Sequence, residues 1–431
     1  MANNTNTALQ KQVIYSVYVR NHTEEGTFSA VIPDLDRIKA LGCDIIWFMP
    51  IHPIGVAGKK GSLGCPYANR DYRTTNPEYG TMEDFKKLVA EIHARGMKVM
   101  IDVVYNHTSP DSVLVKQHPE YFYHKPDGSL GNKVGDWTDV VDLDYHNADL
   151  WKYQIDSLLM WADIVDGFRC DVAPLVPIEF WKAAREAVAQ KHPDFIWLAE
   201  SIDAGFGAYV RSQGMDAASD ARTYEAFDLE YEYDVHPVFL RYMKGEITLT
   251  NYMDVLNLQE AAYPENYNKM RFLENHDQPR VASLLSDEDS IENLTAFLYF
   301  KKGTTLIYAG QEYEDAHVPS LFDKDVIATD EKTGKNLSVL MSALYRMKHE
   351  LLGEDDYFHA VADDAQHIVI ATRENRTAKK YGIFSLHGRA NTVKIDAPDG
   401  IYRNAVDGTD VEVKNGEIRC EGKPVIFAVN R

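Results

Sequence analysis

Eight short apolar runs alternate with helical patterns along most of this chain, and this alternation is the feature that most constrains its fold. Each run has the length of a buried strand, and most of the segments between them carry the periodicity of amphipathic helices. Short strands that alternate with helices pair in parallel, so eight of them predict an α/β fold, a closed (β/α)8 barrel of the TIM type. The predicted strands are Val13–Val19, Ile45–Met49, Val99–Val104, Val165–Cys170, Phe195–Ala199, Ala226–Leu229, Met270–Leu273 and Thr304–Tyr308.

Two segments break the alternation. From Thr108 to about Tyr145 the residues are polar and aromatic with frequent turn formers, which predicts an excursion out of the barrel after its third strand. After about Leu352, short apolar runs between turn clusters predict a small antiparallel β domain. We therefore divide the chain into a barrel (1–107 and 146–352), a short excursion (108–145) and a C-terminal β-sandwich (353–431). The acidic run Glu354-Asp355-Asp356 is expected to be a solvated linker.

Composition excludes several classes of protein. With 431 residues, 45% of them hydrophobic, the chain can bury a large core. Its formal net charge of -21 disfavours nucleic acid and anionic membranes as partners. The polar start Met1–Thr7 has no apolar segment typical of a signal peptide, and no run is long enough to span a membrane. The four cysteines lie far apart and form no CxxC pair, so we expect reduced thiols and a cytoplasmic location.

Charged and hydrogen-bonding residues end four of the predicted strands, and barrels of this type place their chemistry at the C-terminal strand ends. In the fourth strand, Arg169 and Asp171 point to the same face, where the guanidinium favours the ionised form that a nucleophile needs. A buried ion pair without catalytic function explains this stretch alone equally well. The four strand ends together favour catalysis; they are Asp102–His107, Arg169–Asp171, Ala199–Ser201 and Glu274–Asp277.

The stretches DVVYNH, GFRCDVA, LAES and FLENHD resemble the four signature regions of the α-amylase family of glycoside hydrolases. They occur in the family's order, and the resemblance spans the barrel, the excursion (the family's domain B) and the C-terminal domain (its domain C). It implies that Asp171 is the nucleophile, Glu200 the general acid/base and Asp277 the third carboxylate.

The resemblance also implies roles for residues around these carboxylates. Arg169 would orient the nucleophile, and Asp102 would support the arginine. The remaining implied positions are His107 and His276, which would hydrogen-bond the sugar, Tyr67, which would stack under it, and Asn106, at a ligand position of the family's structural calcium.

The implied activity is retaining cleavage of α-1,4-glucosidic bonds in maltodextrins or starch-type glucans through a covalent glucosyl-enzyme intermediate. The alternatives are an α-1,6-glucosidase and a glucan transglycosylase. Many relatives that cleave α-1,6 bonds have a valine directly after the nucleophile, as this chain has Val172. Hydrolysis and transglycosylation use the same covalent intermediate, so the residues do not separate them. A non-catalytic glucan-binding protein is disfavoured because all three carboxylates are present. Ala68 stands where many exo-acting relatives have an aspartate, which favours an open, endo-acting cleft.

The chain departs from the family at the calcium site. Pro174 and Leu175 stand where typical members have a lysine and a histidine whose carbonyl binds the ion. Calcium takes about six to eight oxygen ligands, and one surviving asparagine, Asn106, falls well short. We therefore expect no metal ion and no other cofactor, with a structural calcium as the alternative that Asn106 leaves open.

Overall fold

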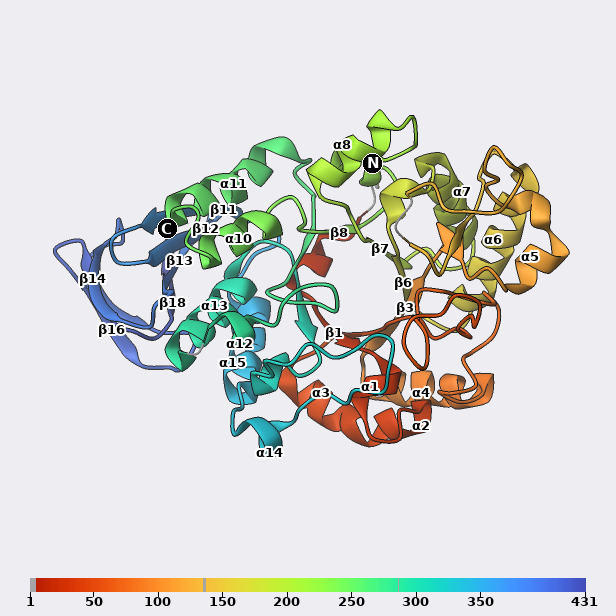
Figure 1. The fold of residues 1–431 in the computed structure, drawn as a ribbon. Helices are drawn as coiled ribbons and strands as arrows, with labels where there is room; N and C mark the ends of the chain where they lie inside the picture. Colours follow the sequence, from red (N-terminus) through yellow and green to blue (C-terminus); the bar gives the residue numbers. More distant parts are fainter. Residues whose placement is uncertain (1–4, 135–136, 286) are drawn as a thin grey trace.

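The barrel strands close into a ring of eight parallel strands in the order β1-β10-β9-β8-β7-β6-β3-β2, as predicted. The computed structural model describes residues 5–134, 137–285 and 287–431, so Met1–Asn4 of the polar start lie outside the described residues. Figure 1 shows this ring with its surrounding helices. The strands are β1 (Val13–Val17), β2 (Ile45–Phe48), β3 (Lys98–Val103), β6 (Gly167–Cys170), β7 (Ile196–Ala199), β8 (Leu229–Tyr231), β9 (Lys269–Arg271) and β10 (Thr304–Tyr308).

Strand β1 closes the ring because it pairs with a strand on each side. Ile14 lies beside Ile45 of β2, and Val13 lies beside Thr305 of β10. In the closed order, β7 stands four strands from β1 in either direction and therefore lies across the ring from it.

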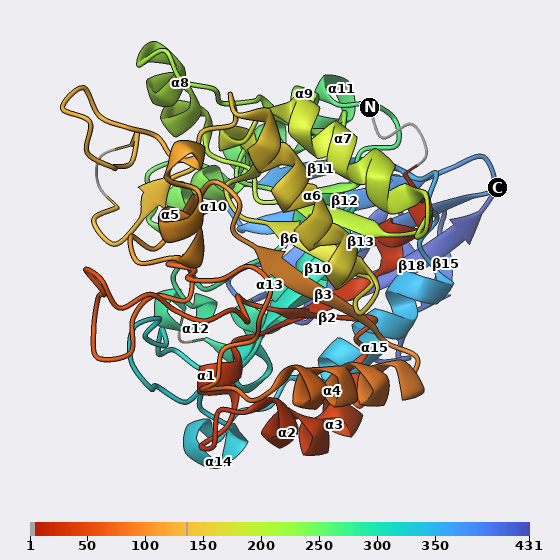
Figure 2. The same ribbon diagram turned by 90° about the vertical axis from the view of Figure 1, so that its right-hand side faces the viewer.

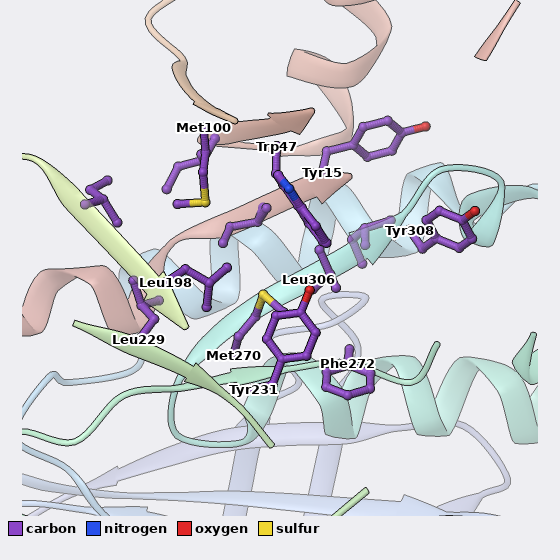
Figure 3. Packing of buried hydrophobic residues seen from close by; sticks show 14 of the residues in the cluster. Tyr15, Trp47, Met100, Leu198, Leu229, Tyr231, Met270, Phe272, Leu306 and Tyr308 are labelled. Atoms are coloured by element: carbon purple, nitrogen blue, oxygen red, sulfur yellow. The ribbon is translucent and has the colours of Figure 1, made fainter. Parts of the chain in front are cut away.

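Side chains fill the inside of the ring, as Figure 3 shows for residues from most of its strands. Trp47, Leu198 and Tyr231 are fully buried there, and burial of each such side chain contributes about 1.5–3 kcal/mol. Tyr15 points out of the ring instead, and its hydroxyl donates a hydrogen bond of 2.6 Å to Glu312. The interior is thus a packed core, and the chemistry must lie at one of its ends.

The helices follow the strands around the ring (Figures 1 and 2). Helix α4 (Met82–Ala94) shows how the sequence specifies them: Thr81 and Asp84 form a reciprocal capping box at its start. Gly96, at φ +69°, follows its end. The other helices of the barrel domain are α1 (Val19–His22), α2 (Phe28–Val31), α3 (Leu35–Leu41), α6 (Ala148–Ala162), α7 (Ile178–Ala189), α8 (Ala204–Ser212), α9 (Asp220–Thr223), α10 (His236–Met243), α11 (Leu249–Ala262), α12 (Val281–Leu284), α13 (Glu288–Phe300), α14 (Asp330–Thr333) and α15 (Ser338–Glu350).

The excursion after β3 contains little regular structure. It has a short helix, α5 (Val113–Gln117), and a two-stranded antiparallel pair of β4 (His107–Thr108) and β5 (Val141–Asp142). In this pair His107 lies beside Asp142, so the start and the end of the excursion meet next to the barrel. Its domain boundaries at 108 and 145 stay a prediction.

The C-terminal domain consists of two four-stranded antiparallel sheets, which confirms the predicted fold class for this region. Side chains such as Ile383 and Ile418, one from each sheet, share a single apolar core. Asn257 of α11 exchanges two hydrogen bonds with the backbone of Ala360 and so ties the domain to the barrel. The first sheet contains β11 (Tyr357–Asp363), β12 (Ile368–Glu374), β13 (Ala378–Ser385) and β18 (Val425–Asn430), and the second contains β14 (Ala390–Lys394), β15 (Gly400–Arg403), β16 (Asp410–Lys414) and β17 (Glu417–Glu421).

Two expectations about local structure were wrong. Strand β8 spans Leu229–Tyr231 instead of 226–229. Its charged residue Glu230 is buried because Lys269 on the neighbouring strand pairs with it at 3.2 Å, and an apolar pattern cannot reveal such a strand. The acidic run at 354–356 is not wholly solvated, because Asp356 is fully buried and pairs with Lys380 of β13.

Among the described residues, no helix combines the length and the apolar character needed to cross a bilayer. The four cysteines are free, and three of them, Cys43, Cys170 and Cys420, are buried.

Candidate active site

Arg169 of β6 lies at the centre of the site, fully buried below the C-terminal end of the barrel. Its Nη1 donates to Asp102 Oδ1 and to Asp171 Oδ1, both at 2.9 Å. Its Nη2 lies 2.9 Å from Glu200 Oε1, an ion pair without hydrogen-bond geometry. Its Nε donates to the hydroxyl of Tyr231 at 3.1 Å. One guanidinium therefore gathers three carboxyl groups from three neighbouring strand ends.

The strand register produces this arrangement. Asp102 of β3 and Arg169 lie side by side in the ladder, and Asp171 follows two residues later on the same face. Glu200 follows the end of β7, where its amide donates to the carbonyl of Cys170. Cys170 itself is buried on the other face, as strand alternation predicts.

Aromatic rings surround the guanidinium. The carbon Cζ of Arg169 lies 5.2 Å from the ring centroid of Trp47, 5.5 Å from that of Tyr67 and 5.3 Å from that of Tyr231. Cation–π attraction favours the charged arginine here. The rings also restrict its position, because a buried side chain packed on three sides has no alternative rotamer space.

Tyr67 and His276 form a second set of contacts beside the arginine. Their rings stack with centroids 5.3 Å apart at an interplanar angle of 10°. The Tyr67 hydroxyl donates to Asp102 Oδ2 at 3.0 Å and lies 2.8 Å from His276 Nε2. His276 Nε2 also lies 3.1 Å from Asp277 Oδ2. Because Tyr67 and His276 link Asp277 to Asp102, all three predicted carboxylates and Asp102 belong to one network.

The carboxyl groups of this network differ in acidity. Burial raises the pKa of Asp171 to about 6, although Arg169 opposes the shift, and burial raises the pKa of Glu200 to about 7. The neighbouring Asp171 and Asp277 raise the pKa of Glu200 further. Partial desolvation would raise the pKa of Asp277 too, but its side chain is 44% exposed, and His276 outweighs this effect and lowers that pKa to about 2. Near neutral pH, Asp277 is thus ionised, Asp171 is largely ionised, and Glu200 is close to half protonated.

The backbone between the two strand ends also contributes. Val172, directly after Asp171, has φ +36° and ψ +44°, a left-handed conformation that a β-branched residue rarely adopts. In this conformation its amide donates a hydrogen bond of 2.8 Å to Glu200 Oε2. Such a conformation costs about 1–3 kcal/mol and persists where the surrounding structure imposes it.

A pocket of about 210 Å³ opens onto these groups. Six of the predicted site residues line it, and they are Tyr67, His107, Asp171, Glu200, His276 and Asp277. His107 Nε2 lies 3.9 Å from Asp171 Oδ2, and burial lowers the pKa of His107, so this imidazole is neutral near pH 7. Arg169 and Asp102 lie below the pocket as fully buried supports.

Two residues that entered the sequence argument lie elsewhere. Asn106 lines a separate cleft toward the excursion, and its amide nitrogen lies 3.1 Å from His107 Nδ1. Ala68 is buried and does not line the pocket, so its position does not test the expected open, endo-acting cleft, which stays a prediction.

Several lining and supporting residues were missed by sequence reasoning. Lys60, Asp139 and Leu321 line the pocket from three loops, and Trp137, which the sequence left between sugar stacking and local packing, lines it as well. Only Tyr231 had a detectable signal, because alternation from Leu229 places it inside the barrel. Ion pairs between distant loops, such as the one between Lys60 and Asp139, leave no local pattern.

The corner where the family's calcium would bind supplies few side-chain oxygens. Asp142 Oδ2 accepts a hydrogen bond of 2.6 Å from the amide of Lys133, and Asp142 Oδ1 is buried without a partner. Together with Asn106 and Asp144, which line the same cleft, this gives three side chains toward a shell of about six to eight oxygens. Within the described residues, no three His, Cys, Asp or Glu side chains form a group that could hold a metal ion. The side chains present therefore do not fit a calcium site, and metal independence stays a prediction.

Comparison with known proteins agrees with this geometry. The model of the α-amylase catalytic domain matches residues 4–133 and 133–350, and that of the bacterial α-amylase C-terminal domain matches residues 359–427. The chain belongs to the α-amylase family. Among solved structures of the family, an α-amylase from Lactobacillus plantarum is 46% identical, with a TM-score of 0.95 over 98% of this chain and 100% of that one.

Two further relatives of the family differ in extent. A maltogenic α-amylase from Thermotoga neapolitana is 32% identical, with a TM-score of 0.85 over 98% of this chain and 99% of that one. An α-amylase from Haloarcula japonica is 27% identical over 70% of this chain, which corresponds to 44% of its own length. The chain thus spans less than half the length of that curated relative.

Proposed function

We propose that the protein is a retaining glycoside hydrolase that cleaves α-1,4-glucosidic bonds in maltodextrins or starch-type glucans. The convergence of Asp171, Glu200 and Asp277 on one pocket, above a single buried arginine, carries the proposal. Asp171 is the nucleophile, Glu200 the general acid/base and Asp277 the carboxylate that stabilises the positive charge developing on the sugar. The α-amylases among its relatives support an α-glucan as substrate.

In the first step, Asp171 Oδ2 attacks the anomeric carbon, because Oδ1 is occupied by Arg169. The glycosidic C–O bond breaks as Glu200 passes its proton to the leaving oxygen, and a glucosyl ester forms on Asp171. In the second step, Glu200 removes a proton from water, which attacks the same carbon and releases the sugar with its configuration retained. Because its pKa is raised to about 7, Glu200 can donate a proton in the first step and accept one in the second.

The residues around the carboxylates bind the sugar and orient the nucleophile. His107, His276 and Tyr67 line the pocket and contact the bound sugar, while Arg169 and Asp102 fix the nucleophile from below. No cofactor takes part in either step. We further propose that the protein acts in the cytoplasm without a nucleic-acid partner, which the scattered free cysteines and the net charge of -21 support.

Product analysis tests the proposal. The protein is incubated with maltoheptaose, pullulan and isomaltose, and NMR follows the anomer released first. We expect cleavage of maltoheptaose with initial release of the α-anomer and no cleavage of isomaltose. Rapid cleavage of isomaltose would instead assign the α-1,6 activity that Val172 suggests, and products longer than the substrate would assign transglycosylation.

A further inference from the structure

We propose that the ion pair between Lys60 and Asp139 is the wall that closes the glycone side of the pocket and so restricts cleavage to the ends of glucan chains. Glycone here means the sugar that becomes attached to Asp171. The inference rests on the proposed function and specifies its substrate. It replaces the open, endo-acting cleft that Ala68 led us to expect.

The ion pair joins two separate loops across the pocket. Lys60 belongs to the β2 loop (residues 54–66), and Asp139 belongs to the excursion after β3. Lys60 Nζ lies 3.0 Å from Asp139 Oδ1, and both residues line the pocket. The Asp139 side chain is only 4% exposed, whereas that of Lys60 is 40% exposed. The lysine therefore covers a buried carboxylate from the solvent side.

Hydrogen bonds on both sides hold the β2 loop in place, so Lys60 does not lie on a free surface loop. On one side, the amide and hydroxyl of Ser62 donate to Asp323 Oδ1 at 2.8 and 2.6 Å, and the amide of Leu63 donates to the carbonyl of Phe322 at 3.0 Å. On the other side, the amide of Val56 donates to Asp111 at 3.2 Å. These contacts fix the loop between the segment after β10 and the excursion.

The order of the strands shows which end of the sugar chain meets this wall. The loops after β2 and β10 flank β1, and β7, which carries Glu200 at its end, lies across the ring from β1. Glu200 protonates the leaving oxygen, so the leaving part of the glucan extends on the β7 side. The β2 loop therefore bounds the opposite side, where the non-reducing end lies.

The size and electrostatics of the pocket agree with a closed end. A volume of about 210 Å³ lies below the ~300–1,000 Å³ of pockets that enclose drug-sized ligands, and it suits one sugar ring. A longer glycone would have to separate Lys60 from Asp139. This would remove the cation that covers a carboxylate only 4% exposed, a loss that solvent around the 40% exposed lysine reduces.

A substrate blocked at its non-reducing end tests the inference. Maltoheptaoside with a 4,6-O-ethylidene group on its terminal glucose is compared with the free maltoheptaoside by kcat/KM and by product chromatography. We expect the unmodified protein to cleave the blocked substrate at least about tenfold more slowly, as for a group that a specificity pocket rejects. We expect its first products from the free substrate to be glucose and the maltoheptaoside shortened by one unit, because the closed pocket accepts one sugar ring.

Removal of the lysine should open the wall. For Lys60→Ala, and for Lys60→Met, which keeps the aliphatic stem, we expect the ratio of blocked to free kcat/KM to rise about tenfold and the products to lengthen. The matched control is Lys59→Ala, because Lys59 is a neighbouring exposed lysine outside the pocket, and its bond to the carbonyl of Ser62 lies within the same loop, so the variant removes a loop contact without removing the wall. It should behave as the unmodified protein does.

The outcomes separate this inference from the proposed function. Equal rates on the two substrates by the unmodified protein, or unchanged ratios in both Lys60 variants with unchanged melting temperatures, would overturn the wall and leave the α-1,4 hydrolase intact. A complete absence of α-1,4 cleavage by the unmodified protein would overturn both.

Discussion

Two buried glutamates at the ends of neighbouring barrel strands have pKa values that are shifted in opposite directions. Glu200 shares one guanidinium with Asp102 and Asp171, and its pKa is raised to about 7. Glu232, just after β8, has Lys301 at 2.6 Å and Arg271 at 3.0 Å, and its pKa is lowered despite complete burial. Burial alone therefore does not decide whether a carboxyl can exchange protons. The ratio of cations to carboxylates around it does.

The largest effect should follow loss of the nucleophile from the carboxylate-rich cluster. We expect Asp171→Asn to lower kcat by at least about 10³-fold, because no other group can form the covalent bond. The melting temperature should stay unchanged or rise, because three carboxyl groups share one arginine and one of them loses its charge. Turnover measurements with thermal unfolding check both parts. A variant that keeps more than a tenth of wild-type turnover would remove Asp171 from this role.

The cation-rich cluster should respond in the opposite way. Glu232→Gln leaves Arg271 and Lys301 buried without their carboxylate, so we expect the free energy of unfolding to fall by about 3–5 kcal/mol. Urea denaturation measures this. The control is Glu179→Gln, which breaks an exposed pair with Arg222 that contributes about 0–1 kcal/mol. Similar losses in the two variants would contradict the comparison.

The pH dependence sharpens the comparison. Activity should rise as Asp171 ionises through a pKa of about 6 and fall as Glu200 loses its proton through about 7, which gives a narrow optimum between these values. Stability should also fall as pH rises from the ordinary glutamate pKa toward 7, because folded Glu200 binds its proton more tightly than unfolded Glu200 does. Melting temperatures across this range, for the wild type and for Glu200→Gln, measure the effect. The variant should lose part of the decline, and an unchanged slope would contradict the raised pKa.

The smallest effect concerns a third buried carboxyl, that of Asp142. Burial raises its pKa, as it does for Glu200, although the amide and the charge of Lys133 and the nearby His107 oppose the shift. We expect excess EDTA to leave the melting temperature and the activity unchanged, because Asp142 and the two other oxygen-bearing side chains at the corner of the family's calcium site fall short of the about six to eight ligands of calcium. A drop in melting temperature that added calcium reverses would show that a structural ion binds here.

The sequence predicts the ring of strands better than the position of every strand. Apolar runs such as Ile45–Phe48 and Thr304–Tyr308 are buried on both faces, so hydrophobicity alone locates them. Strands β8 and β9 are different, because Glu230, Lys269 and Arg271 are buried through ion pairs between strands. Such ion pairs join residues far apart in the chain, so local sequence patterns do not predict them.

The same reasoning separates the parts of the site. Asp171 and Glu200 follow directly from strand ends and a closed barrel, because register brings consecutive strand ends together. The wall formed by Lys60 and Asp139 depends on how two loops fold, and loop paths have no periodicity from which to derive them. The left-handed backbone at Val172 was equally hidden, because valine is a poor indicator of positive φ.

The closure of the ring through β1 has a consequence for biosynthesis. Strand β1 is the first barrel strand to leave the ribosome, yet its neighbour β10 is the last to be made, and the two pair directly. At about 5–20 residues per second, the edge of β1 waits for tens of seconds with unpaired backbone groups. Contacts between such distant segments also slow folding, since the chain must first close a long loop. The nascent barrel is thus exposed to aggregation until β10 emerges, and translation speed sets the length of that exposure.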